Sequence, residues 1–420
     1  MKKYMPRIVD SILKNKLEYM GAVVIEGPKW CGKSTTAKQV SKSLIELQDP
    51  DKKIQYDNIS NTKPSLFLEG DKPRLFDEWQ MYPVIWDSVR TDVDHTGLKG
   101  QYILTGSAKP KEDGIMHTGT GRISKLLMRP MTLYESGDSN GKVSLADIIE
   151  GKEISAVSKL DLDGILNAMI RGGWPESLNI DGDNKYKVAK DYVKSLLNED
   201  VKSIDGVERD RLKMDTLLKS ICRNISTSIN KTTIINDISN YFTNELSRPT
   251  VDDYLTTLEK LNVLEYVPAT NLNLRSSIQL RTSPKIELVD PSIIIASLGL
   301  KKEDLLNDLN FTGFIFENMC YRDLRVYAES MDAELFYYRD NKDFEVDFIL
   351  RTESGKWGAI EVKLGAKQVD EAAKNLKKFK EKVDLEKSGE PSFLLVLTAA
   401  ELSYVRDDGV YVVSIGNLKN

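Results

Sequence analysis

The chain has 420 residues, and this length predicts about two to four domains of roughly 100–200 residues each. Hydrophobic residues make up 40% and charged residues 29%, as in folded globular proteins, and no apolar run approaches the ~20 residues of a transmembrane helix. We therefore expect no membrane span. The formal net charge of −5 argues against a protein that coats nucleic acid.

The cysteine and histidine content also limits the function. Three cysteines without a CxxC pair, beside only two histidines, exclude a zinc cluster, so any metal ion must be held by oxygen ligands. The N-terminal residues 1–20 carry charges where a signal peptide needs an apolar stretch. Together these features predict a cytoplasmic protein.

The first motif joins a strand, a glycine-rich loop and a helix in AVVIEGPKWCGKSTTAKQV, residues 22–40. Gly27 to Ser34 fits G-x-x-x-x-G-K-[S/T], in which loop amides cradle phosphate. Lys33 would reach the β and γ phosphates, and Ser34 would hold Mg²⁺. The residues expected around the nucleotide are Gly27, Pro28, Lys29, Trp30, Cys31, Gly32, Lys33, Ser34 and Thr35.

Two further strands are expected to end at the same site. RLFDEWQ (74–80) supplies Asp77 to hold Mg²⁺ through water and Glu78 to orient or deprotonate the attacking water. This acidic pair favours ATP hydrolysis over small-molecule kinase chemistry. QYILTGS (101–107) ends in Thr105, which would lie near the γ-phosphate; an ordinary glycine turn before a capped helix is an equal alternative.

Several segments in this order resemble a family of bacterial and archaeal AAA-superfamily ATPases with a C-terminal domain of unknown function. They are MPRIVD (5–10), GPKWCGKSTT, FDEWQ, YILTGS, GRISKLLMRPMTLYE (121–135) and GGWPE (172–176). The resemblance implies an ATPase with an arginine finger at Arg122, or at Arg129 as a second candidate. A finger that acts in trans would require a homo-oligomer. For each arginine the alternative is a surface or helix-end charge.

The resemblance and the composition together predict an α/β protein of four parts. An AAA-type P-loop ATPase core spans residues 1–135, and a helical lid follows at 136–210, with an apolar helix stripe that ends at GGWPE. Residues 211–290 suggest three helices and a hairpin, an order that resembles a winged helix. Residues 291–420 are expected to form a restriction-endonuclease-like mixed α/β domain.

The charges of the winged-helix-like part favour a protein partner over sequence-specific DNA binding. Asp252 and Asp253 open its third helix and would repel phosphates. The only basic cluster is Arg275, Arg281 and Lys285 on the expected wing.

The C-terminal part contains EVDFILRTESGKWGAIEVK, which predicts an antiparallel hairpin of strands 345–350 and 357–364. Setting Phe348 opposite Ile360 puts Asp347 opposite Glu361. Alternation alone predicts a solvated face for Glu361 and Lys363. Two opposed carboxylates repel each other, however, and a bound Mg²⁺ or Mn²⁺ would explain their presence.

The spacing of Asp347, Glu361 and Lys363 resembles the PD-(D/E)xK nuclease motif, with Val346 in the place of proline. Helix 313–324 carries Glu317, where that superfamily often supplies a further metal ligand. The resemblance implies metal ligation by Glu317, Asp347 and Glu361, with Glu361 and Lys363 catalytic. Two functions stay open: an ATP-dependent switch whose nuclease-like domain cuts or docks to nucleic acid, and an ATP-gated scaffold whose nuclease-like domain only binds a partner.

Overall fold

We describe the protein from a computed structural model, in which the described residues are 4–106, 118–201, 207, 209–228, 231–241, 247–270, 283–340 and 342–420. The chain divides into two compact units. The first comprises Met1–Pro130, Asn198–Arg209 and Thr256–Val263, and the second comprises Met131–Leu197, Asp210–Leu255 and Leu264–Asn420. Within the described ranges, no helix combines the length and apolarity needed to cross a membrane.

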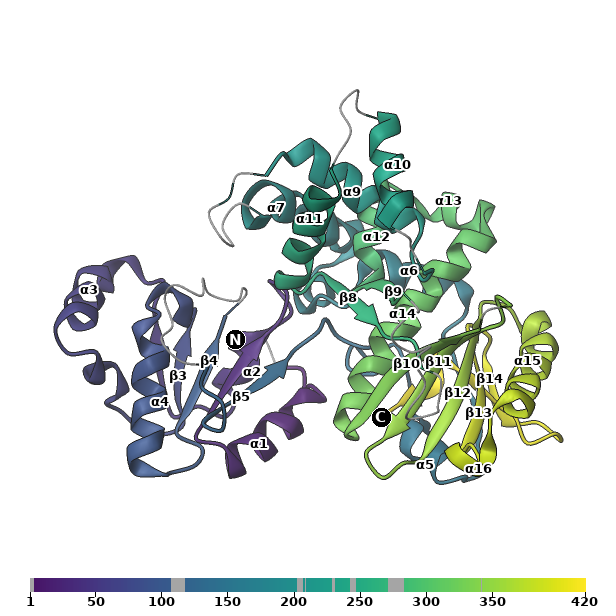
Figure 1. The fold of residues 1–420 in the computed structure, drawn as a ribbon, viewed down its shortest axis with the longest axis horizontal. Coiled ribbons are helices and arrows are strands. Elements are labelled where there is room, and N and C mark those ends of the chain that lie inside the picture. Colours follow the sequence, from purple (N-terminus) through teal and green to yellow (C-terminus); the bar gives the residue numbers. More distant parts are fainter. Residues whose placement is uncertain are drawn as a thin grey trace. The chain divides into compact units, whose positions relative to one another are not determined.

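The first unit is built on a five-stranded sheet with the order β2-β3-β4-β1-β5, in which all neighbouring strands are parallel (Figure 1). Its strands are β1 (Ala22–Glu26), β2 (Ser43–Glu46), β3 (Arg74–Asp77), β4 (Tyr102–Thr105) and β5 (Ile123–Leu127). Its helices include α1 (Val9–Tyr19), α2 (Lys33–Lys38), α3 (Lys53–Thr62) and α4 (Val84–Thr96). The predicted strands that carry the P-loop, Asp77 and Thr105 are thus confirmed.

Alternate residues of β1 enter two separate cores. Ala22 and Val24 pack with residues of α3 and α4, whereas Val23 and Ile25 pack with residues of α1 and α2. Helices therefore cover both faces of the sheet, as a parallel sheet requires, because both of its faces are apolar. This arrangement confirms the predicted α/β class. The first segment of this unit ends at Pro130, whereas the ATPase core was predicted to end at residue 135.

The second unit contains a seven-stranded mixed sheet with the order β10-β11-β12-β13-β15-β14-β7. Its strands are β7 (Ser155–Val157), β10 (Ala333–Arg339), β11 (Glu345–Thr352), β12 (Trp357–Lys363), β13 (Phe393–Thr398), β14 (Leu402–Val405) and β15 (Tyr411–Ser414), and a small parallel pair joins β6 (Val143–Ser144) to β16 (Leu418–Lys419). The helices of this unit are α5 (Leu145–Ile149), α6 (Leu162–Arg171), α7 (Lys187–Ser195), α9 (Arg211–Arg223), α10 (Lys231–Tyr241), α12 (Pro291–Leu298), α13 (Lys302–Asn307), α14 (Leu309–Ser330), α15 (Val369–Lys382) and α16 (Leu385–Ser388).

The segment predicted as a helical lid differs from expectation in one respect. It contains the predicted helix, α6, but its strand β7 pairs with β14, so this segment completes the edge of the C-terminal sheet. A strand of three residues is too short to show an alternating pattern, and its pairing depends on a partner far along the chain.

The segment predicted as a winged helix contains three helices and a hairpin in the expected order. They are α9, α10, α11 (Arg248–Lys260), β8 (Leu264–Val267) and β9 (Lys285–Leu288), and α11 crosses the division between the two units. Arg275 and Arg281 lie outside the described residues. The prediction for Lys285 was wrong, because its side chain is 1% exposed and cannot serve as a surface charge on a wing.

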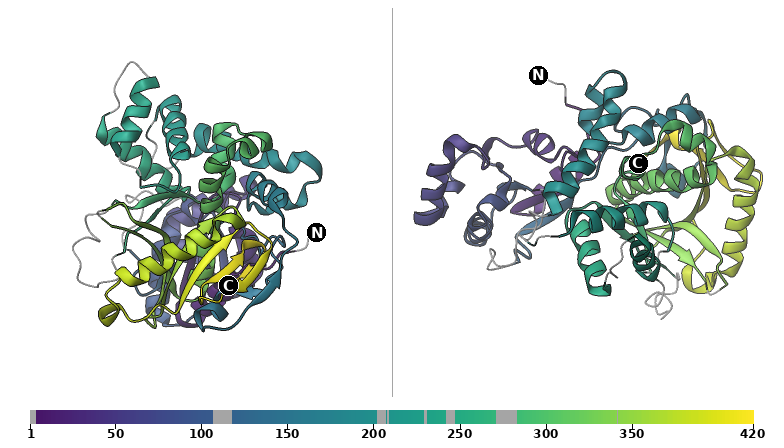
Figure 2. Two further views of the ribbon diagram at one scale, coloured as in Figure 1. Left: turned by 90° about the vertical axis from the view of Figure 1, so that its right-hand side faces the viewer. Right: turned by 90° about the horizontal axis from the view of Figure 1, so that it is seen from above.

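The C-terminal sheet is enclosed between two helices. Figure 2 shows α14 and α15 on opposite sides of it. Tyr321 of α14 stacks on Phe348 of β11, while α15 packs through Val369, Ala372, Ala373, Leu376 and Phe379 against the other face. Both faces of β12 are therefore covered, so Glu361 is buried, while Lys363 at the end of the strand is partly exposed.

Candidate functional site

The glycine-rich loop joins β1 to α2 with a backbone that only particular residues tolerate. Gly27 has a φ of +150°, and a Cβ there would lie 2.1 Å from the carbonyl oxygen of Met128. Gly32 has a φ of 104°, and Trp30 adopts a φ of 66° despite its side chain. Such a loop, held between strand and helix, has the form that cradles phosphate in P-loop proteins.

Lys33, the first residue of α2, is buried against this loop. Its Nζ donates hydrogen bonds to the carbonyl oxygens of Gly27 at 2.9 Å and Pro28 at 2.8 Å. These two carbonyls hold the ammonium group where the motif expects it to meet phosphate. Phosphate oxygens would be stronger partners because they are charged.

Asp77, at the end of β3, bonds to the end of β4 and to the first turn of α2. Its Oδ1 accepts hydrogen bonds from Ser34 Oγ at 2.6 Å and from Thr105 Oγ1 at 2.5 Å. The strand register explains this meeting, because Thr105 pairs with both Ile25 of β1 and Asp77 of β3. Hydroxyl and carboxylate oxygens are suitable Mg²⁺ ligands, so these residues fit the ion that Mg-ATP would bring.

Glu78 follows Asp77 in a left-handed backbone conformation, with a φ of 58° and a ψ of 48°. Its Oε2 accepts a hydrogen bond from Gln80 Nε2 at 2.5 Å. Sequence reasoning missed Gln80, although it lies in the quoted motif RLFDEWQ. Gly106 leaves room for it, since a Cβ at that position would be 2.5 Å from Gln80 Oε1.

Two residues before α1, Tyr4 and Arg7, form hydrogen bonds to the P-loop and its surroundings. Neither residue was assigned a role from the sequence. Arg7 is buried and donates to the carbonyl oxygens of Cys31 and Arg129, both at 2.8 Å. Tyr4 shares a hydrogen bond of 3.0 Å with Thr36 of α2. Arg7 of the segment MPRIVD therefore supports the P-loop directly, and Tyr4, just before that segment, contacts α2.

Arg122 lies at the edge of the sheet opposite the P-loop. It immediately precedes Ile123, which pairs with Ala22 at the start of β1, whereas the P-loop follows the end of β1. Its Nε lies 2.5 Å from Asp94 Oδ1 of α4, and its side chain is 46% exposed. Arg122 therefore cannot reach the P-loop of its own chain, and a role in trans remains the prediction. Arg129, the second candidate, is buried rather than a surface charge.

If Arg122 acts in trans, ATP hydrolysis per chain should rise with protein concentration, because each site needs a neighbouring chain. An Arg122→Ala chain mixed with a Lys33→Ala chain should regain activity that neither shows alone. Arg90→Ala is the matched control, since Arg90 pairs with the same Asp94 at 3.0 Å. A hydrolysis rate independent of concentration, in a chain that light scattering with ATP shows to be monomeric, would contradict the trans role.

The predicted hairpin register in the C-terminal sheet is confirmed only in part. Phe348 pairs with Ile360 and Leu350 with Gly358, but the ladder of β11 and β12 ends at Phe348. Beyond it, Asp347 Oδ2 accepts a hydrogen bond from the backbone N–H of Val362 at 2.7 Å. Asp347 and Glu361 are therefore not paired in the ladder as expected. The side-chain carboxylate of Asp347, rather than a backbone carbonyl of β11, accepts the N–H of Val362.

The prediction of a solvated face around Glu361 was wrong. Glu361 is 3% exposed because α15 covers this face of β12. Its Oε1 accepts from Asn375 Nδ2 of α15 at 2.5 Å, and its Oε2 accepts from Lys363 Nζ at 2.7 Å. Lys363 Nζ also lies 3.5 Å from Asp347 Oδ2. Burial and the neighbouring Asp347 raise the pKa of Glu361 above its ordinary value.

An additional lysine enters this cluster from β9. Lys285 Nζ lies 3.1 Å from Glu317 Oε1 and 2.5 Å from Glu345 Oε1. Burial alone would lower the pKa of Lys285, but the surrounding carboxylates outweigh that effect and raise it, so the side chain is charged. We call Glu317, Asp347, Glu361, Glu345, Lys285 and Lys363 the acidic cluster.

The acidic cluster does not fit a divalent metal ion in this arrangement. Its carboxylates already accept bonds from lysine, asparagine or backbone donors. Across the part of the chain that the structure describes, no group of three or more His, Cys, Asp or Glu side chains could hold a metal ion. The expected metal site at Glu317, Asp347 and Glu361 is therefore not formed.

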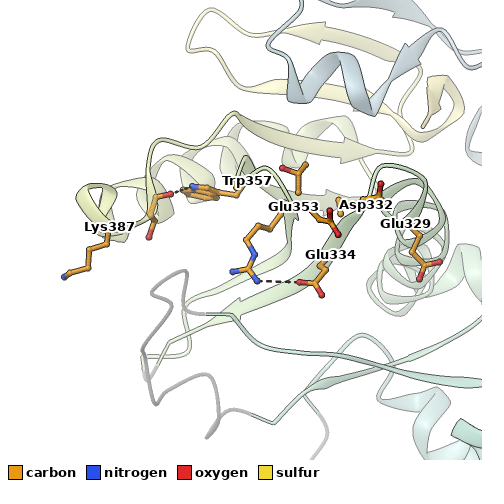
Figure 3. Close-up of a pocket in the computed structure, with 11 residues that line it drawn as sticks. Glu329, Asp332, Glu334, Glu353, Trp357 and Lys387 are labelled. Atoms are coloured by element: carbon orange, nitrogen blue, oxygen red, sulfur yellow. Dashed lines mark hydrogen bonds and ion pairs between the residues drawn. The ribbon is translucent and has the colours of Figure 1, made fainter. Parts of the chain in front are cut away.

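Two pockets flank this domain. One, of about 570 Å³, opens beside Glu361 and Lys363 and is edged by Lys374 and Lys378 of α15. The other, of about 740 Å³, lies near Trp357 and the start of β10 (Figure 3). The four labelled carboxylates of the second pocket, Glu329, Asp332, Glu334 and Glu353, outnumber its cations Arg351 and Lys387, so it is unsuited to phosphate.

Comparison with known families matches three segments of the chain. Residues 20–136 match an AAA domain, residues 163–304 match a domain of unknown function (DUF8612), and residues 312–418 match another domain of unknown function (DUF4143). A comparison with curated proteins gives no match.

Three solved structures illustrate the similarity of the chain to known folds. The Walker-type ATPase of Pyrococcus abyssi is 15% identical, with 70% of this chain and 96% of that one covered and a TM-score of 0.43. The Orc1 protein of Aeropyrum pernix, solved with DNA, is 10% identical, with coverage of 73% and 97% and a TM-score of 0.22. A signal-transduction ATPase with a tetratricopeptide repeat sensor from Pyrococcus horikoshii is 14% identical, with coverage of 78% and 48% and a TM-score of 0.27.

Because these TM-scores lie below 0.5, the assignment depends on the AAA domain match and on the geometry of the nucleotide site. The match begins just before β1 and includes Lys33, Asp77 and Thr105. Residues 20–136 therefore form an AAA-type P-loop ATPase core that binds ATP.

Proposed function

We propose that this protein is an ATP-hydrolysing switch whose nucleotide state controls its C-terminal domain. The observation that supports it best is the junction of Ser34, Asp77 and Thr105 beside the buried Lys33. These groups come from the ends of β3 and β4 and from the first turn of α2, and Glu78 directly follows Asp77 at this junction. Such an arrangement serves hydrolysis rather than storage of nucleotide.

Each residue has a distinct role in the proposal. Lys33 binds the β and γ phosphates, and Ser34 and Asp77 hold Mg²⁺, which neutralises charge on the phosphates when it is bound. Glu78 orients the attacking water and accepts its proton, while Gln80 positions the Glu78 carboxylate. Arg122 of a neighbouring chain completes the site in a homo-oligomer.

The C-terminal domain is proposed to have the nuclease-like fold and to dock to a partner. Its order of α14, β10, β11, β12, α15 and β13 in a mixed sheet supports the resemblance to restriction endonucleases. The smaller pocket is lined by Lys363, Lys374 and Lys378 and by two acids, Glu361 and Glu371; this excess of lysines favours an anionic partner such as nucleic acid. A protein partner at the winged-helix-like segment is the second candidate, supported by Asp252 and Asp253 near the start of α11.

Glu78→Gln should keep ATP binding and reduce hydrolysis by about 100-fold or more, because loss of a general base costs roughly 10²–10⁴ in rate. Glutamine preserves the size of the side chain and leaves the phosphate-binding residues intact. Titration with a fluorescent ATP analogue and phosphate release would measure the two effects separately.

Glu46→Gln is the matched control, since Glu46 ends β2 and forms an exposed pair with Lys38. It should hydrolyse ATP at the wild-type rate. If hydrolysis by Glu78→Gln were unchanged, the assignment of Glu78 would be wrong. Hydrogen exchange in residues 312–418 should differ between ATP-trapped Glu78→Gln and the ADP-bound wild type; identical exchange would refute the switch.

A further inference from the structure

Lys285 is the one member of the acidic cluster that comes from outside the segment matched at 312–418. It lies in β9, within the segment matched at 163–304. Residues 268–270 next to β8 lie along β10, since the N–H of Thr270 donates to Tyr337 O at 2.8 Å and the N–H of Tyr337 donates to Pro268 O at 3.1 Å. The β8–β9 hairpin is therefore fixed against the sheet that carries the cluster.

The side chain of Lys285 is buried among carboxylates, as a bound cation would be, and does not lie on the surface. Its side chain is 1% exposed, its Nζ contacts two carboxylates, and the ring centroid of Tyr337 lies 5.4 Å from it. Both carboxylates come from different elements, Glu317 from α14 and Glu345 from β11. A single positive charge thus links the helix to the sheet.

We propose that the Lys285 ammonium group is the built-in cation of the acidic cluster and replaces the divalent metal ion that a nuclease of this fold would bind. Lys363 forms ion pairs with Glu361 and Asp347 on one side, and Lys285 forms ion pairs with Glu317 and Glu345 on the other. Buried carboxylates need such partners, since an unpaired buried charge is strongly destabilising.

A metal ion and Lys285 exclude each other in this arrangement. A divalent cation bound by Glu317 would lie a few ångströms from a buried ammonium group, where like charges repel strongly at low dielectric. The ion would also have to displace the donors that already occupy Asp347 Oδ2 and both oxygens of Glu361. The domain therefore keeps its shape without metal and does not cut nucleic acid.

Thermal unfolding of the nucleotide-free full chain with Mn²⁺ or with chelator tests this inference. All chains would carry Asp77→Asn, so that an ion at the nucleotide site does not contribute. With Lys285 present, Mn²⁺ should change Tm by less than about 1 °C. Lys285→Met should unfold at a lower temperature in chelator and regain several degrees with Mn²⁺, because the metal can then replace the lost charge.

Lys363→Met is the matched control, because it removes the other lysine of the cluster but retains Lys285. The Tm of Lys363→Met should not rise with Mn²⁺. When Asp347→Asn is added to Lys285→Met, the rise in Tm that Mn²⁺ gives the single variant should disappear. Lys285→Gln serves as a second variant if Lys285→Met does not fold. Stabilisation by Mn²⁺ with Lys285 present, no gain in a folded Lys285 variant, or Mn²⁺-dependent cleavage of nucleic acid by the wild type would each overturn the proposal. Because no nucleotide is used, these outcomes are separate from the fate of the proposed ATPase.

Discussion

Lys33→Ala should weaken Mg-ATP binding by about two to three orders of magnitude, because bonds from an ammonium group to phosphate contribute roughly 1.5–3 kcal/mol each. Lys33 begins α2 and is buried, and its Nζ contacts the carbonyl oxygens of Gly27 and Pro28 in the loop. Alanine would leave those carbonyls facing the phosphates, and like partial charges repel.

The matched control is Lys38→Ala on the same helix. Lys38 is exposed and pairs only with Glu46 among the described ion pairs, so its loss should change affinity by less than about threefold, in keeping with the small contribution of surface ion pairs. Titration with a fluorescent ATP analogue compares the two variants. Wild-type affinity in a folded Lys33→Ala chain would contradict the assignment of this loop as the phosphate site.

The nucleotide site could be predicted from sequence because its determinants are local or follow from parallel strands. The P-loop is one continuous motif, and Asp77 and Thr105 each end an apolar strand. The carboxyl ends of neighbouring parallel strands meet at one edge of a sheet, so their convergence needed no knowledge of side-chain packing. Arg7 was missed because its partners are distant in the sequence, and Gln80 was missed because its bond to Glu78 forms across a left-handed turn that the motif does not specify.

In the acidic cluster, the strand pairing could be predicted from the sequence, but the burial of its charged residues could not. The offset of Phe348 and Ile360 could be predicted because a one-residue slip would mix apolar and polar faces. The burial of Glu361 could not, since it depends on α15 folding back over β12. Lys285 was placed on a wing because a charged residue near a hairpin usually faces water, and its burial depends on distant carboxylates.

The edge of the C-terminal sheet illustrates the same limit. Ser155–Val157 contains too few residues for a periodic signal, and its partner β14 lies far along the chain. The helices and strands of this region could therefore be predicted from the sequence better than the sheet or domain to which each one belongs. Domain bounds drawn from loops and composition cannot anticipate a strand that joins a sheet formed by a later segment.

The largest effect on stability is expected at Arg322, which is buried in the second unit between Asp290 and Asp323. Its Nη1 lies 2.9 Å from Asp290 Oδ2, and its Nη2 lies 2.7 Å from Asp323 Oδ1. The same carboxylates accept backbone N–H groups from Gly173 at 2.8 Å and Leu133 at 2.9 Å. One guanidinium group thus supports acids that fix segments from distant parts of the chain.

Arg322→Met should lower the free energy of unfolding by about 3–5 kcal/mol, because methionine fills the space but leaves two buried carboxylates without a cation. Arg325→Met is the matched control on α14. Arg325 is 29% exposed and lies 3.4 Å from Glu329, so its loss should cost less than about 1 kcal/mol. Chemical denaturation followed by tryptophan fluorescence measures both variants.

The pH dependence of the loss separates an unpaired charge from simple misfit. Burial raises the pKa of Asp323 to about 6 even with Arg322 in place, and removal of the arginine should raise it further. A carboxyl group whose pKa is higher in the folded than in the unfolded state binds more protons when folded, so stability rises as pH falls. The cost of Arg322→Met should therefore be smaller at pH 5 than at pH 8, whereas the cost of Arg325→Met should be nearly the same at both. An equal loss at the two pH values would mean that packing around residue 322, rather than the charge of Asp290 and Asp323, determines the stability of this region.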